Sequence, residues 1–218
     1  MRTAGRARWK PRRAKATDVD LDATFRPFVI GGFVIIILIV LPYRLRSQAT
    51  GQKLDRTQES IPMLVTIRLA GLVLFLSVYM FMIDPARTAW SAIPLPQSVR
   101  WGGVILGLVA AMAELWTLRS LGPNLTDTVV TRRTHTLVTR GPYRWVRHPF
   151  YDCMVLFTTS AALMMANWFV LAMGVLTFAL LAMRSRTEEQ KLLERFGEPY
   201  RAYRATTGRF IPGVGRVL

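Results

Sequence analysis

The sequence predicts an all-α membrane protein with five transmembrane helices, the last two of which form a C-terminal helical hairpin. Two features of the composition support this fold class, since 51% of the 218 residues are hydrophobic and only 19% are charged. The third observation is that the apolar residues gather in runs long enough to cross a bilayer. This hydrophobicity also excludes intrinsic disorder for most of the chain.

The net charge indicates which kinds of molecule the protein can bind. Lys and Arg number 29 against 13 acidic residues, which gives a charge of +16. Such a basic chain suits nucleic acid or an anionic membrane surface. The long apolar runs favour the membrane, so we expect the bilayer as a partner and no nucleic acid. A single cysteine, Cys153, cannot form an intrachain disulfide, and with only two histidines we expect no metal site.

Four apolar runs carry the predicted spans. They cover residues 27–43, 69–83, 101–118 and 149–183. The second extends back to Ile61 if the side chain of Arg68 reaches the membrane interface. The last run has 35 residues, too many for one untilted crossing. Asn167 divides it into two halves, which predicts a tight hairpin and brings the number of helices to five.

Glu114 is a lone carboxylate within the third run. It would be costly if it faced lipid. We expect it to pair with Arg68 or Arg119 or to reach the interface. The alternative is that it points into a cofactor or acceptor cavity.

The chain divides into three predicted parts. Residues 1–26 form a basic N-terminal tail, residues 27–98 hold the first two spans, and residues 99–218 form a C-terminal core. The tail could contact anionic lipid, although a solvated end is the simpler interpretation.

The distribution of Lys and Arg predicts the orientation. Segments 44–60, 119–148 and 184–218 share one side and carry eighteen of these residues, against nine in the segments of the other side. The positive-inside rule therefore makes the first side cytosolic. The tail alone carries eight basic residues and would lie outside, but most are distant from the first span.

The first polar segment that flanks the hairpin ends in HTLVTRGPYRWVRHPFY. Gly141 and Pro142 signal a turn, and Pro149 suits the first turn of a helix. Arg147 and His148 would then stand beside free backbone N–H groups, an arrangement that binds an anion such as a carboxylate. The alternative is a snorkelling arginine within an interfacial aromatic belt.

The second polar segment begins RSRTEEQKLLERFGEPYRAYR. An apolar stripe at helical spacing consists of Leu192, Leu193 and Phe196. Gly197 should end this helix, and Pro199 can begin another. Arg184 and Glu188 share one helix face, with Glu189 about 100° round from it. An exposed helix of mixed charge is the alternative.

Together the two segments resemble the isoprenylcysteine carboxyl methyltransferase and related phospholipid methyltransferase families, over roughly residues 99–212. The matching residues are His135-Thr-Leu-Val138, Gly141-Pro-Tyr143, Arg147-His-Pro-Phe-Tyr151, Arg184, Glu188-Glu189, Phe196-Gly197, Tyr200 and Tyr203. The first two spans resemble the family only in being hydrophobic.

The resemblance implies an integral-membrane enzyme that uses S-adenosyl-L-methionine, bound by cytosolic segments of the C-terminal core. Arg184 would face the acceptor, while Glu188 and His148 would contact the cofactor and serve in catalysis. The other implied cofactor-binding residues are His135, Thr136, Leu137, Val138, Tyr143, Pro149, Phe150 and Tyr151. Asn124 is a weaker candidate, and no metal is implied.

The acceptor would be a lipid or a lipid-linked molecule that enters from the bilayer. Carboxyl O-methylation of an isoprenylcysteine-type group and N-methylation of a phospholipid amine both stay open. A nicotinamide-dependent membrane reductase and a non-catalytic membrane protein are the remaining alternatives. The Arg-rich composition looks bacterial, which predicts the inner, cytoplasmic membrane as the location.

Overall fold

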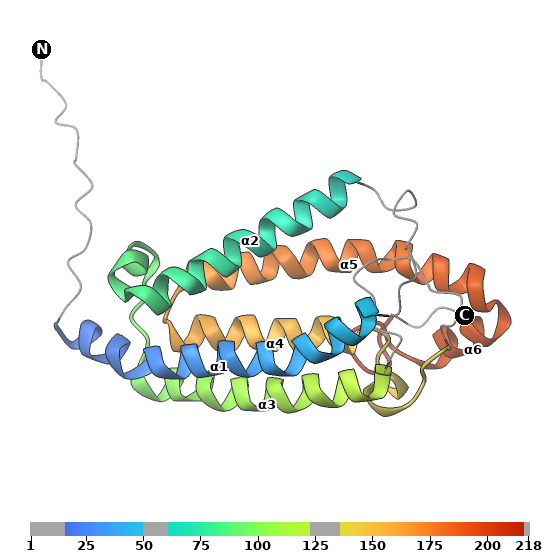
Figure 1. Cartoon of the computed structure of the whole chain (residues 1–218), viewed down its shortest axis with the longest axis horizontal. Helices are drawn as coiled ribbons and strands as arrows, with labels where there is room; N and C mark the ends of the chain where they lie inside the picture. Colours follow the sequence, from blue (N-terminus) through green and yellow to red (C-terminus); the bar gives the residue numbers. More distant parts are fainter. Residues whose placement is uncertain (1–15, 50–60, 123–135, 216–218) are drawn as a thin grey trace, which may run out of the picture.

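The computed structural model describes residues 16–49, 61–122 and 136–215, and these form a bundle of helices (Figure 1). The five long helices are α1 (Ala16–Ala49), α2 (Ile61–Ile83), α3 (Gln97–Leu121), α4 (Pro149–Met164) and α5 (Trp168–Phe196). Three short elements complete the described parts: η2 (Pro85–Ser91), η4 (Gly141–Arg144) and α6 (Glu198–Thr206). The predicted all-α fold is confirmed.

The prediction of five membrane spans is confirmed only in part. Within the described residues, four helices are long and apolar enough to cross a bilayer, namely α1, α2, α3 and α5. Helix α4 has 16 residues. At 1.5 Å per residue it is about 24 Å long, shorter than a hydrocarbon core of about 30 Å. The five helices exist, but α4 does not meet the length of a full span by itself.

Helix α1 begins well before the predicted span at residue 27. Its first turns pack against α3, because Phe25 is fully buried and meets the ring of Trp101 at 5.3 Å. Asp22 pairs with the buried Arg100 of α3 at 2.7 Å. These tertiary contacts extend the helix beyond the part that hydropathy alone identifies.

The hairpin forms where Asn167 predicts it. The Asn167 side chain accepts a hydrogen bond from Val170 N at 3.0 Å and so caps α5. Its amide also donates to Ser91 Oγ at 2.7 Å, which fixes η2 to the turn. Ala166 has φ of 47°, so the turn closes through a left-handed residue. We call this the turn end of the bundle.

The interpretation of Glu114 as an interfacial or ion-paired residue was wrong. Its side chain is buried, and among the described residues no ion pair involves it. It lies beside the thiol of Cys153 on α4, and its Oε2 has no hydrogen-bond partner. Arg68 and Arg119 are both exposed. Glu114 is directed inward because it shares the α4-facing side of α3 with Gly103 and Thr117.

Candidate functional site

The two polar segments that flank the hairpin meet at the opposite end of the bundle, which we call the site end. Val146 and Gly208 form a parallel bridge, and Gly208 N donates to Trp145 O at 3.2 Å. Tyr203 Oη donates to Tyr143 O at 2.6 Å. The prediction that these distant segments are neighbours is confirmed.

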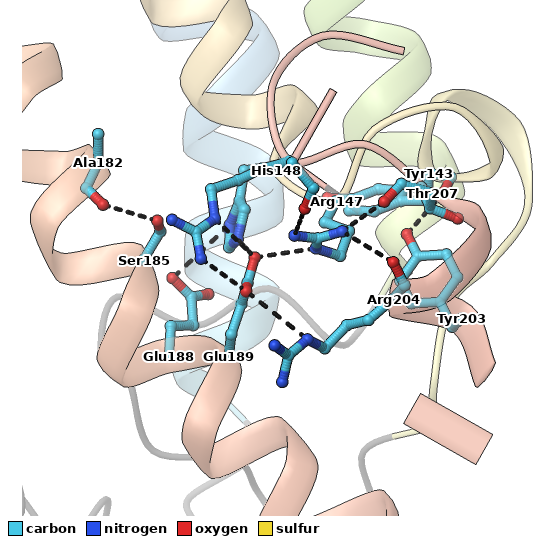
Figure 2. Close-up of polar contacts among 12 residues, drawn as sticks. Tyr143, Arg147, His148, Ala182, Ser185, Glu188, Glu189, Tyr203, Arg204 and Thr207 are labelled. Carbon is cyan, nitrogen blue, oxygen red and sulfur yellow. Dashed lines mark hydrogen bonds and ion pairs between the residues drawn. The ribbon is translucent and has the colours of Figure 1, made fainter. Parts of the chain in front are cut away.

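The carboxylate of Glu189 lies at the centre of this junction (Figure 2). Its Oε1 accepts from Arg147 Nε at 2.9 Å and from His148 Nε2 at 3.1 Å. Arg209 Nη2 donates to its Oε2 at 2.9 Å, and Arg204 Nε stands 4.0 Å from the same oxygen. The side chains of Glu189 and Arg147 are almost completely buried, at 3% and 1% exposed. Such a buried charge is tolerable only because several donors surround it.

Arg147 uses its remaining donors to hold the C-terminal segment, residues 207–215. Its Nη1 donates to Thr207 O, and its Nη2 donates to Gly215 O at 3.0 Å. Gly208 lets this segment turn back on itself, since a Cβ there would stand 1.9 Å from Ile211 O of the same segment. The guanidinium therefore joins α4, α5 and the C-terminal segment in one cluster.

The residues at the start of α4 already contact a carboxylate of the protein itself. The sequence predicts that Arg147 and His148, at this helix entrance, bind a carboxylate. In the structure the carboxylate that both contact is that of Glu189. His148 N donates to Arg209 O at 3.2 Å, so its backbone is also engaged.

Glu188 is the accessible acid of the pair. Its side chain is 31% exposed, and its Oε2 accepts from Tyr151 Oη at 2.9 Å. The ring of His148 stacks on Tyr151, with centroids 5.4 Å apart and an angle of 7°. Arg184 lies one turn before Glu188 on α5 and interacts electrostatically with Tyr151. The structure therefore brings Arg184, Glu188, His148 and Tyr151 together.

The other predicted cofactor residues lie along the approach to α4. Tyr143 and Pro149 are buried, and Phe150 is half-buried with its ring 6.4 Å from that of Tyr151. Leu137 and Val138 are half-buried and Thr136 is exposed. His135 and Asn124 lie outside the described residues.

Gly141 allows the segment that leads to α4 to pack closely against α3. Gly141 has φ of 62°, and a Cβ there would lie 2.1 Å from Ser120 Oγ. Only glycine combines this left-handed backbone with such close contact. The turn that precedes Tyr143 is therefore pressed against the end of α3.

Three tyrosines at the site end keep their protons. Burial raises the pKa of Tyr143 well above its usual value, and the negative charges of Glu188 and Glu114 add to the effect. Burial likewise raises the pKa of Tyr200 and of Tyr203. Tyr200 Oη and Arg204 Nε are buried without a hydrogen-bond partner within the described residues. Within the described residues, the hydroxyl of Tyr200 is therefore a buried donor without an acceptor, whereas Arg204 Nε is ion-paired with Glu189.

Sequence reasoning missed the central role of Glu189 and the contribution of Arg209. A signal for Glu189 was present, because it precedes Leu192 and Phe196 by three and seven residues and so shares their apolar stripe. A carboxylate on an apolar stripe must find buried partners. Arg209 lies 20 residues away in sequence, and no local pattern marks it.

Comparison with known proteins finds a similar family over part of the chain. Residues 103–194 match the model of the isoprenylcysteine carboxyl methyltransferase family. The chain is therefore similar to that family over the segment from the start of α3 to the later part of α5. This segment contains Glu114, Tyr151, Glu188 and Glu189, whereas α1, α2 and the C-terminal segment lie outside it.

The relatives show how far the likeness extends. Protein-S-isoprenylcysteine O-methyltransferase of Dictyostelium discoideum is 28% identical over 54% of this chain and 51% of its own length. The Mus musculus protein of the same name is 36% identical over 51% of this chain and 40% of its own. The chain thus spans about half the length of these relatives, or less.

A solved structure shares the fold. It is that of the eukaryotic intramembrane Ras methyltransferase ICMT, with a TM-score of 0.55 and 20% sequence identity. The alignment covers 93% of this chain and 75% of that one. The likeness in fold therefore includes the first two helices, which the family model does not match.

Proposed function

We propose that the chain is an integral-membrane methyltransferase that transfers the methyl group of S-adenosyl-L-methionine to a carboxylate on an isoprenylcysteine-type, lipid-linked acceptor. The observation that carries the proposal is the position of Glu188, a half-exposed carboxylate held by Tyr151 beside the buried Glu189 cluster. All three residues lie within the segment that matches the methyltransferase family.

The residues of the site suit this cofactor. Glu188 offers a carboxylate to an amino group or to ribose hydroxyls, and the stacked rings of His148 and Tyr151 offer apolar faces. The buried hydroxyl of Tyr200, which has no hydrogen-bond partner within the described residues, could donate to a cofactor oxygen. Thr136, Leu137, Val138, Tyr143, Pro149 and Phe150, with His135, complete the proposed cofactor wall.

The chain's own residues need to do little acid–base work in this reaction. When bound, the cofactor supplies a methyl group on a sulfonium, which an acceptor carboxylate can attack without first losing a proton. Arg184 would hold that carboxylate through its planar fork of donors. Orientation and exclusion of water would then provide most of the rate increase.

His148 suits a positioning role better than direct binding of a cofactor carboxylate. Its Nε2 bonds to Glu189, and its ring stacks on Tyr151. It therefore orients the phenol that in turn holds Glu188. In this scheme Arg184 and Glu188 touch acceptor and cofactor, and His148 acts through Tyr151.

The orientation is part of the proposal. In the sequence, segments 44–60, 119–148 and 184–218 hold most of the Lys and Arg flanking the spans, and the described residues of these segments lie at the site end. By the positive-inside rule this end faces the cytosol. A cytoplasmic-membrane location would let the cofactor arrive from the cytosol and the acceptor from the bilayer.

Binding and transfer by the purified chain in detergent test the proposal. Calorimetry should show S-adenosylhomocysteine bound by the wild type and bound at least tenfold more weakly by Glu188→Gln. Glu194→Gln, an exposed acid on the same helix, should bind as the wild type does. Labelled methyl groups should appear on an S-farnesyl cysteine peptide.

Other outcomes point elsewhere. Arg184→Gln should raise the KM for the peptide without changing S-adenosylhomocysteine affinity, and the exposed Arg186→Gln should change neither. Label on a phospholipid amine instead of the peptide would favour N-methylation. A folded wild type that binds a nicotinamide cofactor, or no cofactor, would contradict the proposal.

A further inference from the structure

A short apolar loop in the C-terminal segment is exposed at the site end. Residues 210–214 read FIPGV and include no charged side chain, and we call them the apolar tip. Its Ile211 and Val214 side chains are 60% and 59% exposed. Two exposed aliphatic side chains are not unusual by themselves, so what they contact must be argued from the position, the backbone and the charge of the loop.

The first residue of the apolar tip shows where the loop lies along α5. The ring of Phe210 is 5.6 Å from that of His148 and 5.1 Å from that of Phe178. Phe178 precedes Arg184, the first charged residue of α5, by six residues, which corresponds to about 9 Å along the helix. The apolar tip therefore begins beside the uncharged part of α5, a helix that is long and apolar enough to cross a bilayer.

The backbone of this loop suits surroundings that contain little water. Arg209 N donates to Val214 O at 2.9 Å, and Val214 N donates to Ile211 O at 3.0 Å, so the loop closes on itself. Arg209 O accepts from His148 N at 3.2 Å, and Pro212 has no backbone N–H. Unsatisfied backbone groups are costly within a bilayer, and these bonds reduce that cost.

Arg209 is the only charged residue in the C-terminal segment, residues 207–215. Its Nε and Nη2 donate to the carboxylate of Glu189 at 3.1 Å and 2.9 Å. The Glu189 side chain is itself only 3% exposed, so the charge of Arg209 is compensated inside the protein. The apolar tip can therefore enter a bilayer without taking an unpaired charge with it.

We propose that the apolar tip inserts into the leaflet at the site end, and that this insertion holds the C-terminal segment against the Glu189 cluster. The partner of this surface is the bilayer itself. Transfer of the Ile211 and Val214 side chains from water to hydrocarbon provides the driving force. The inference concerns how the chain contacts the membrane, and it does not depend on the proposed methyltransferase activity.

The apolar tip and the charged cluster are coupled through Arg209. The backbone N–H of this residue closes the loop on Val214, and its guanidinium binds Glu189. Burial of Ile211 and Val214 in lipid therefore favours the same loop conformation that places the guanidinium against the carboxylate. Through this coupling, contact with the bilayer stabilises the arrangement of the site end.

Fluorescent labels on the full chain in lipid nanodiscs test the insertion. Cys153 is the only cysteine, so Cys153→Ala permits a single labelled cysteine elsewhere. A dye on Val214→Cys, and in a second variant on Ile211→Cys, should be quenched by spin-labelled acyl chains at least half as strongly as a dye on Met183→Cys. Met183 is 60% exposed in the apolar run of α5 and is the reference for the bilayer, whereas the exposed Glu194→Cys is the reference for water. Quenching at both tip positions no stronger than at Glu194 would overturn the proposal.

Amide hydrogen exchange in the same nanodiscs tests whether insertion holds the C-terminal segment. A variant with both Ile211→Asp and Val214→Asp should exchange the amides of residues 207–215 at least tenfold faster than the wild type, because burial of one such side chain typically contributes enough for about a tenfold change. The variant with leucine at both positions should keep the protection of the wild type. Ala202→Asp, at an exposed position of α6, is the matched control and should leave this exchange unchanged. Equal exchange by the aspartate and leucine variants would overturn the coupling between the bilayer and the site end.

Discussion

The site end and the turn end of the same helical hairpin are held together by different forces. At the site end, Glu189 collects Arg147, His148 and Arg209 in a buried charged cluster. Toward the turn end, α4 packs on its neighbours through small residues. There, Ser160 Oγ donates to Gly103 O at 2.7 Å.

Because of this difference, the site end is rigid, whereas the apolar half of the bundle can adapt its packing. The charged cluster has a defined set of donors and acceptors, so it can hold Tyr151 and Glu188 in one arrangement. The apolar half is set by steric contact on the α3 and α5 sides of α4, but it keeps an open cavity beneath α1 and α2. A site that orients reacting groups suits the first construction.

Removal of the central carboxylate should give the largest effect. We expect Glu189→Ala to lower the free energy of unfolding by about 3–5 kcal/mol, because it leaves buried cations without their partner. Thermal unfolding in detergent micelles would measure the loss. Glu194→Ala, an exposed residue of the same helix, should change stability by less than about 0.5 kcal/mol. Similar results for the two variants would show that the cluster does not stabilise the site end.

The same glycine-to-alanine change should have opposite results at two positions in the apolar half. A Cβ at Gly103 would lie 2.9 Å from Leu163 Cβ and 3.0 Å from Ser160 O, so Gly103→Ala should cost about 1–3 kcal/mol. Gly71→Ala meets no neighbour and should be neutral or add up to about 1 kcal/mol through helix propensity. Unfolding of both variants under one set of conditions tests this contrast. Equal effects would mean that α3 and α4 are not closely packed there.

Most of the fold follows from local sequence signals. The apolar runs locate the helices, and Asn167, Pro149 and Gly197 mark where helices begin or end. The first residue of α1 cannot be predicted from local signals, because contacts with α3 extend the helix beyond its apolar run. The inward position of Glu114 also does not follow, since hydropathy does not reveal which face of α3 meets α4.

The candidate site is predictable in part for a similar reason. The hairpin brings its two flanking segments together, so Tyr151 and Glu188 could be placed near each other before the structure was known. Which of the adjacent acids Glu188 and Glu189 is buried depends on tertiary contacts from Arg209 and the C-terminal segment. Such contacts across long sequence separations leave no local pattern.

The smallest effect expected at neutral pH concerns Tyr200, whose buried hydroxyl has no hydrogen-bond partner among the residues that the structure describes. Tyr200→Phe should leave the free energy of unfolding nearly unchanged at pH 7, because it removes an unsatisfied polar group. Tyr203→Phe is the matched control on the same helix. It loses the bond to Tyr143 O and should cost about 1 kcal/mol.

Alkaline pH should then separate Tyr200→Phe from the wild type. Burial, together with the charge of Glu189, raises the pKa of Tyr200 in the folded protein. In the unfolded chain a tyrosine ionises near pH 10, so the unfolded state loses its proton first as pH rises. The stabilisation from this group is therefore complete below about pH 10 and declines above it. Unfolding measured from about pH 9 to 11 should show a shallower decline for Tyr200→Phe than for the wild type. Parallel curves would mean that Tyr200 ionises as readily in the folded protein as in the unfolded chain, and hence that the site end admits water around it.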